Sequence, residues 1–199
     1  MAYTTVSDLK SYMGITDSTD DALLTVLIGA AQKQIETLTG RTFEAAADTT
    51  RTFTPLGVDY DGNLWGDGIT LGLDTDLYSV TSITNGDGSN IPTNAVSLLP
   101  LNGVPYSAIR IKLNTQYVWT YTGSPDGSVL ITGRWAYSLT PPADVVELTK
   151  ETAARMYRRR NGTENRITDA ISADAVFLPA YKLPDDIAKL LTPYIRRGW

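Results

Sequence analysis

The sequence has 199 residues and a hydrophobic content of 42%, which is enough to bury a core in one large domain or in one domain carrying an insertion. It contains no His and no Cys, which excludes Ser-His-Asp triads, Cys-His pairs, disulfides and metal sites built on imidazole or thiolate. No Gly-x-x-x-x-Gly-Lys-Ser/Thr motif occurs, so a Walker phosphate loop is excluded as well. Because no long apolar run is present, we expect no membrane span.

The net charge of −5 is unevenly placed along the chain. Residues 1–140 carry 7 Lys/Arg against 14 Asp/Glu, whereas residues 141–199 carry 10 against 8. A generally acidic chain does not suit a free-standing binder of duplex DNA, because that function needs many cationic contacts to phosphate. The basic C-terminal part is consistent with ordinary solubility or with docking onto an acidic partner surface.

Residues 1–40 predict two helices joined by a short polar turn. The first covers residues 6–13, with Ser7 as its cap and Gly14 as its end. The second lies within residues 19–40 and ends at Gly40. Its apolar side chains recur in steps of three and four, as one face of a helix requires: Leu24, Leu27, Ile28, Ala31, Ile35 and Leu38.

Residues 51–135 change to the alternating pattern of half-buried strands. The alternating segments are 69–74, 109–113, 117–121 and 129–135. Asn-Gly and Asp-Gly turn signals stand between them, among them Asn85-Gly86 and Asn102-Gly103. Short strands with frequent turns predict an antiparallel sandwich or small barrel.

Helix returns after Thr140, with Pro141 and Pro142 in its first turn and Asn161-Gly162 as its stop. We expect this helix to pack against the long N-terminal one, with small residues allowing close approach: Ala153 and Ala154 opposite Gly29, Ala30 and Ala31. Residues 163–183 show no clear period and predict an extended arm. A short amphipathic helix follows from Pro184, and its apolar edge comprises Ile187, Leu190 and Leu191.

We find no convincing site for chemistry, and assign no catalytic residue, cofactor or metal. Residues 59–70 resemble a calcium loop in Asp59, Asp61, Asn63 and Asp67. However, Leu64 stands where glycine is needed and Thr70 where the bidentate Glu belongs, so we interpret the stretch as a hairpin loop. The sequence does not locate paired carboxylates for glycoside hydrolysis, because their spacing is spatial. Four aromatic residues could line a sugar groove, although their pattern is more typical of a sheet core: Trp65, Trp119, Tyr121 and Trp135.

The arginines Arg155 and 158–160 have two interpretations. They complement the negative end of the helix dipole and form a solvated face. Alternatively, they contact a neighbouring acidic subunit or DNA passing nearby. We retain Arg155, Arg158 and Arg159 as candidate subunit contacts.

The order of these patterns resembles the head–tail connector proteins of tailed bacteriophages, also called adaptor or head completion proteins. The N-terminal likeness rests on Val6-Ser-Asp-Leu-Lys-Ser-Tyr-Met-Gly-Ile15, the acidic turn Asp17-Ser-Thr-Asp-Asp21 and the helix running into Thr39-Gly-Arg-Thr-Phe43. The C-terminal likeness rests on the helix beginning Pro142-Ala-Asp-Val-Val and on the Leu190-Leu191-x-Pro193-Tyr-x-Arg-Arg197 ending. The β region is not part of the minimal family pattern, although larger members carry such insertions.

The resemblance implies a non-enzymatic virion protein, assembled in the host cytoplasm. Such proteins form a ring, commonly of about twelve copies, between the portal of a DNA-filled head and a stopper or tail. DNA would pass through the ring without specific binding, and no membrane is involved. The C-terminal segment of the family typically reaches into the portal, which implies these portal contacts here: Leu190, Leu191, Tyr194, Ile195, Arg196, Arg197 and Trp199.

We therefore predict an α+β fold. Residues 1–49 and 137–162 form the helical core, residues 50–136 an inserted antiparallel β-sandwich or small barrel, and residues 163–199 an extended C-terminal docking arm. The alternative function is a carbohydrate- or host-surface-binding module built on the β insertion, and an acid/base hydrolase is a third hypothesis.

Overall fold

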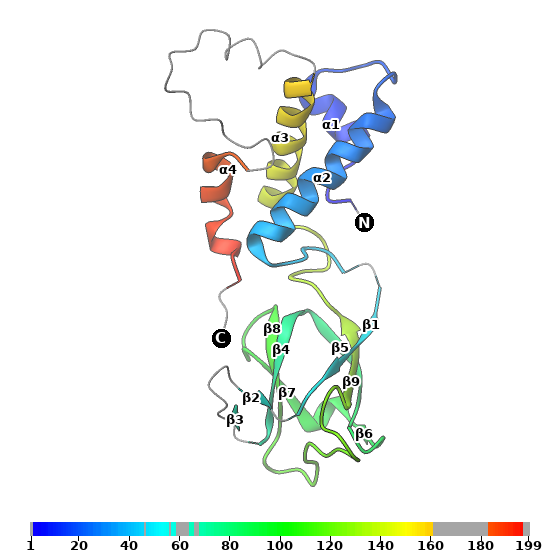
Figure 1. The fold of residues 1–199 in the computed structure, drawn as a ribbon, viewed down its shortest axis with the longest axis vertical. Helices are drawn as coiled ribbons and strands as arrows, with labels where there is room; N and C mark the ends of the chain where they lie inside the picture. Colours follow the sequence, from blue (N-terminus) through cyan, green and yellow to red (C-terminus); the bar gives the residue numbers. More distant parts are fainter. Residues whose placement is uncertain are drawn as a thin grey trace. The chain divides into compact units, whose positions relative to one another are not determined.

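The computed structural model, drawn in Figure 1, describes residues 2–45, 47–55, 57–58, 64–65, 68–160 and 183–196. The chain divides into two compact units: a helical unit of Met1–Arg41 and Pro141–Trp199, and a β unit of Thr42–Thr140. Helices together with antiparallel strands confirm the predicted α+β class. The β unit starts eight residues before and ends four residues after the insertion predicted from the sequence.

The two N-terminal helices are α1 (Val6–Met13) and α2 (Asp21–Thr39). The cap of α1 is Thr5 and not the predicted Ser7: the Thr5 hydroxyl accepts the Asp8 backbone N–H at 3.1 Å and donates to the Asp8 carboxylate at 2.7 Å. Both helices end at glycines in the left-handed conformation, with φ of 71° at Gly14 and 65° at Gly40.

The long helix α2 packs beside α3 (Ala143–Arg160), as Figure 1 shows, so the predicted pairing is confirmed. Their shared core contains these buried residues: Leu9, Leu24, Ile28, Ala31, Ala153 and Ala154. Gly29 and Ala30 are exposed, which corrects the expectation that they line the contact. Successive helix residues point about 100° apart, so Ala31 alone of the three faces α3.

In its described residues, the β unit has two larger antiparallel sheets and one short ladder. The sheet of order β1-β9-β5-β6 comprises Thr49–Phe53, Val129–Arg134, Ser79–Thr84 and Asn90–Ile91. The sheet of order β4-β8-β7 comprises Thr70–Leu77, Tyr106–Ile111 and Val96–Leu99. The ladder pairs β2 (Gly57–Val58) with β3 (Leu64–Trp65), and the short 3-10 turn η1 (Thr93–Ala95) precedes β7.

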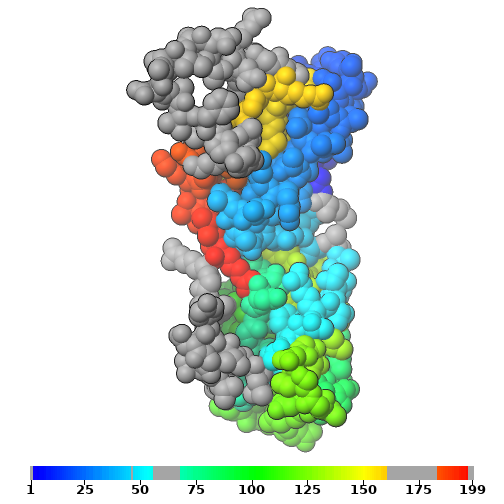
Figure 2. All heavy atoms as spheres, in the orientation of Figure 1, coloured from blue at the N-terminus to red at the C-terminus, as the bar shows by residue number. Residues whose placement is uncertain are grey.

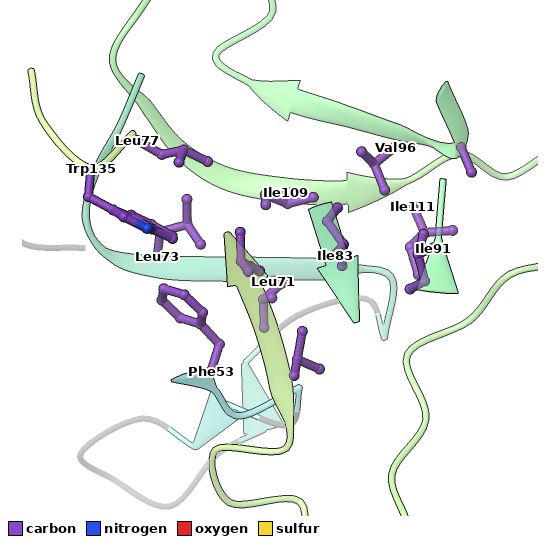
Figure 3. Close-up of a cluster of buried hydrophobic side chains, with 13 residues drawn as sticks. Phe53, Leu71, Leu73, Leu77, Ile83, Ile91, Val96, Ile109, Ile111 and Trp135 are labelled. Atoms are coloured by element: carbon purple, nitrogen blue, oxygen red, sulfur yellow. The ribbon is translucent and has the colours of Figure 1, made fainter. Parts of the chain in front are cut away.

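Inward side chains of both larger sheets form one hydrophobic core, shown in Figure 3. The predicted alternation holds on β9 and the residue after it, since Val129, Ile131 and Trp135 are buried. The Trp135 indole stacks on Phe53 with ring centroids 5.3 Å apart and donates its N–H to the Thr49 carbonyl at 2.8 Å. The choice between sandwich and barrel stays a prediction.

One predicted strand is wrong. Residues 117–120 form no regular strand, and Tyr121 makes only an isolated bridge to Gly86. A side chain orders this segment instead: Asn85 donates to the Val118 carbonyl at 2.9 Å and accepts the Thr120 backbone N–H at 3.0 Å. The period-two pattern was misleading because a distant polar side chain satisfies the backbone that a neighbouring strand would otherwise pair.

Leu113, which the same alternating pattern placed in the core, is exposed. It follows the end of β8, where the chain enters a turn.

Candidate docking surface of the C-terminal segment

The C-terminal segment, defined as residues 183–196, packs against the helical unit. It contains the short helix α4 (Asp185–Leu190) and the 3-10 turn η3 (Thr192–Tyr194). Leu183, Ile187 and Leu191 recur every four residues and are all buried. Figure 2 shows the surface of this segment, coloured orange to red, beside the blue atoms of α2. The short helix predicted from Pro184 is therefore confirmed, whereas residues 163–182 of the predicted extended arm lie outside the described residues.

An ion-pair cluster fixes α4 to α3. The Arg155 guanidinium donates to both carboxylate oxygens of Asp186, at 3.2 and 2.5 Å, and to Glu151 at 2.5 Å. These hydrogen bonds hold the pKa of Asp186 below its ordinary value and raise that of Arg155. A two-pronged contact of this kind specifies orientation as well as attraction.

Three further hydrogen bonds hold the end of the segment. The Tyr194 hydroxyl donates to Asp144 at 2.6 Å, and Arg41 Nε donates to the Tyr194 carbonyl at 2.7 Å. The Arg196 backbone N–H donates to the Thr39 carbonyl at 2.8 Å. That carbonyl belongs to the last turn of α2, where carbonyl groups lack partners inside the helix. The segment thus supplies part of the C-terminal cap of α2.

Two apolar side chains of the same segment are exposed, among exposed polar residues that include Asp185, Lys189 and Thr192. Leu190 is 61% exposed and Ile195 is 37% exposed. Both lie within six residues of each other along the chain, which makes the segment a candidate interaction surface. The segment therefore has an inner side fixed to its own chain and an outer side available for contact.

The predicted portal contacts differ in how exposed they are and in whether they bond within their own chain. Leu190 and Ile195 are exposed, whereas Leu191 is fully buried in its own helical unit and is not displayed for docking. Tyr194 and Arg196 help to fix the segment, as described above. Arg197 and Trp199 lie outside the described residues.

The candidate subunit contacts also differ in how exposed they are. Arg155 forms ion pairs with Asp186 and Glu151 of its own chain, and its role as a subunit contact stays a prediction. Arg158 and Arg159 lie in the last turn of α3 and are exposed.

Sequence reasoning missed the residues that hold the segment down, above all Asp186, Asp144 and Arg41. A usable signal existed, since Leu183, Ile187 and Leu191 are spaced for one helical face. The partners of Asp186 and Arg41 lie far away along the chain, however, and no local pattern identifies them.

The features weighed as chemical sites have separate outcomes. The calcium-like residues of 59–67 lie outside the described residues. Within the described ranges, no group of three or more Asp or Glu side chains is arranged to hold a metal ion. Trp119 is partly buried against the β core and donates its indole N–H to the Ile69 carbonyl at 2.9 Å, so it serves the fold. Among the helices that are described, none has the length and hydropathy of a membrane span.

Comparison with known families bears on the N-terminal part of the chain. Residues 3–61, which contain α1, α2 and the start of the β unit, match the family described as Phage gp6-like head-tail connector protein. The resemblance to the head–tail connector family is confirmed. No curated protein sequence matches the chain significantly.

A solved structure shares the fold over nearly the whole chain. It is a chain from the neck of an empty GTA particle computed with C6 symmetry, 16% identical, with a TM-score of 0.58. The match covers 99% of this chain and 91% of that chain, so the β unit is part of the shared fold. The family match thus concerns residues 3–61, and the structural match shows a shared fold over nearly the whole chain.

Proposed function

We propose that this chain is a structural virion protein that forms a ring connecting the portal of the DNA-filled head to the tail or to a stopper. The family match and the fold shared with a particle-neck chain support the proposal. The observation that carries it is the C-terminal segment, whose polar and buried inner side is fixed while Leu190 and Ile195 face outward.

In the proposed complex, Leu190 and Ile195 enter apolar pockets of the portal. A segment that is already ordered loses little conformational freedom on binding, which strengthens association. Arg196, Arg197 and Trp199 continue the contact toward the chain end, where Arg and Trp side chains commonly contribute much of the binding energy. Leu191 contributes indirectly, by keeping the segment in place.

The distribution of charge favours ring contacts made by the helical units. Residues 42–140 carry 9 Asp/Glu and 4 Lys/Arg, a net of −5, whereas the remaining residues carry 13 of each. Repeated β units would therefore repel one another, while neutral helical units would not. We place Arg158 and Arg159 at this contact, in a closed head-to-tail ring of about twelve copies. DNA passes through the ring without specific binding.

The test uses point variants of the full chain and isolated portal rings. The double substitution Leu190→Ser with Ile195→Ser should abolish portal binding while leaving the thermal unfolding temperature within a few degrees of wild type. The control is Leu113→Ser, which removes an exposed leucine of the β unit and should bind normally. Point variants are sharper than removal of residues 184–199, because that deletion also strips Ile187 and Leu191 from the core. Undiminished binding by the double variant would refute the assigned surface.

Ring formation is tested separately by electron microscopy of the protein with its portal. The proposal expects rings seated on the portal. Replacing Arg158 and Arg159 by Glu should reduce the number of rings more than replacing Lys112 of the β unit by Glu. Rings unaffected by the arginine reversal would overturn the placement of the subunit contact.

A further inference from the structure

Two Asn-Gly pairs of the β unit share the same dipeptide and have opposite surroundings. Such pairs are the sites at which asparagine most readily loses its side-chain nitrogen, because glycine has no Cβ to obstruct attack by its own backbone nitrogen. Asn85-Gly86 and Asn102-Gly103 therefore have the same intrinsic chemistry. Their difference in reactivity is set by the fold.

The Asn85 side chain is locked. It is 4% exposed, its Nδ2 donates to the Val118 carbonyl and to the Thr120 hydroxyl, and its Oδ1 accepts from the Thr120 and Gly86 backbone N–H groups. The Gly86 nitrogen, which would have to attack, is itself a donor to this carboxamide. The surroundings of Gly86 are also tightly packed, since a Cβ on Gly86 would lie 2.5 Å from the Thr120 carbonyl oxygen.

The Asn102 side chain has the opposite surroundings. Asn102 and Gly103 are both exposed in the loop between β7 and β8, and nothing lies within 4 Å of a Cβ placed on Gly103. In the described part of the chain, neither the Asn102 carboxamide nor the Gly103 amide takes part in a hydrogen bond. The exposed carboxamide can therefore rotate over the following backbone nitrogen without breaking a hydrogen bond to the described residues.

We propose that Asn102 is a site of spontaneous modification in the folded protein, and that Asn85 is protected. The deprotonated Gly103 nitrogen attacks the Asn102 side-chain carbonyl carbon, a C–N bond forms, and the side-chain nitrogen leaves as ammonia. Water then opens the resulting five-membered succinimide at either carbonyl and gives aspartate or isoaspartate. No oxidant, metal or enzyme is required.

The product introduces a carboxylate between Leu101, which is 71% exposed, and Val104, which is also exposed. An apolar loop therefore gains a negative charge as the protein ages, in a unit that is already acidic. Charge placed within an exposed apolar surface opposes any contact that buries that surface. The modification is thus a slow change of surface chemistry confined to one hairpin.

The experiment follows both sites in one sample of the full chain. Cleavage by trypsin after Arg51 and Arg110 places Asn85 and Asn102 in the same peptide, where fragment masses distinguish them. During incubation at mildly alkaline pH, conversion at Asn102 should exceed that at Asn85 by roughly a hundredfold. At least two hydrogen bonds must break at Asn85, each lowering the rate about tenfold. In urea the two rates should converge.

Gly103→Ala is the matched variant, because the open surroundings and the ordinary φ of Gly103 accept a methyl group. It should fold normally and slow conversion at Asn102 alone. The proposal is overturned if the folded protein converts both sites at one rate, if Asn85 converts faster, or if Gly103→Ala leaves the rate at Asn102 unchanged.

Discussion

Two neighbouring leucines in the C-terminal segment should respond to the same substitution in opposite ways. Leu191 is fully buried, so Leu191→Ala removes packed methyl groups and leaves a cavity, which costs about 2–5 kcal/mol. Leu190 is 61% exposed, so Leu190→Ala should change stability by less than about 0.5 kcal/mol. The two substitutions are chemically identical, and only the side of the segment differs.

The loss at Leu191 is expected to appear first as local opening of residues 183–196. A cost of about 2 kcal/mol raises the population of the open form roughly thirtyfold. Trypsin cleavage after Lys189 reports that population when opening and closing are fast relative to cleavage. Leu191→Ala should therefore speed this cleavage about thirtyfold or more, while Leu190→Ala leaves it near the wild-type rate.

Ile187→Ala gives an independent check, because Ile187 is also fully buried on the inner side of the segment. It should accelerate cleavage as Leu191→Ala does. Equal sensitivity of the Leu190 and Leu191 variants would refute the division into an inner and an outer side. So would slow cleavage in all three variants.

Three further predictions concern single residues. The pKa of Asp186 is held below its ordinary value of 3.8, so its ion pair stabilises the fold above that pH and is lost as the pH falls through the lowered pKa. The difference in Tm between wild type and Asp186→Asn should accordingly shrink in strong acid, and a constant difference would contradict this. Gly133→Ala brings a Cβ into the Ser79 carbonyl oxygen and should cost about 2 kcal/mol in urea unfolding, whereas Gly72→Ala, with open space around it, should not. Asn85→Ala leaves buried partners unpaired and should cost about 3 kcal/mol by the same measurement, and a loss below about 1 kcal/mol would contradict the locking role.

Helix ends and the pairing of helices could be predicted because their signals are local or repeated. Gly14 and Gly40 stand where a left-handed residue must close a helix, and the stripe through Leu24, Ile28 and Ala31 requires an apolar partner. The partner helix was recognisable by its own stripe despite its distance along the chain. Patterns that both partners carry independently are therefore the most reliable ones in this sequence.

The strand predicted around Trp119 was wrong for a related reason. Its alternation of aromatic and other residues is that of a strand, yet its backbone is satisfied by Asn85, more than thirty residues earlier. Alternation records that one face is buried, and says nothing about whether a strand or a side chain supplies the hydrogen bonds. The sequence identified Asn85 only as a turn residue. The same side-chain carboxamide that bonds to its own turn also bonds to the distant segment, and the sequence does not show the second role.

The C-terminal segment shows how the same limit affects a functional prediction. Leu190 and Leu191 are adjacent, apolar and close to the chain end, and sequence reasoning assigned both to one docking surface. Helix geometry turns neighbours about 100° apart, so the two could not both face one flat partner. The every-fourth-residue spacing of Leu183, Ile187 and Leu191 assigns the inner side, and Leu190 is left for the outer one. Applying the helical period to this short helix would have distinguished Leu191, which packs against the chain's own core, from Leu190, which is exposed.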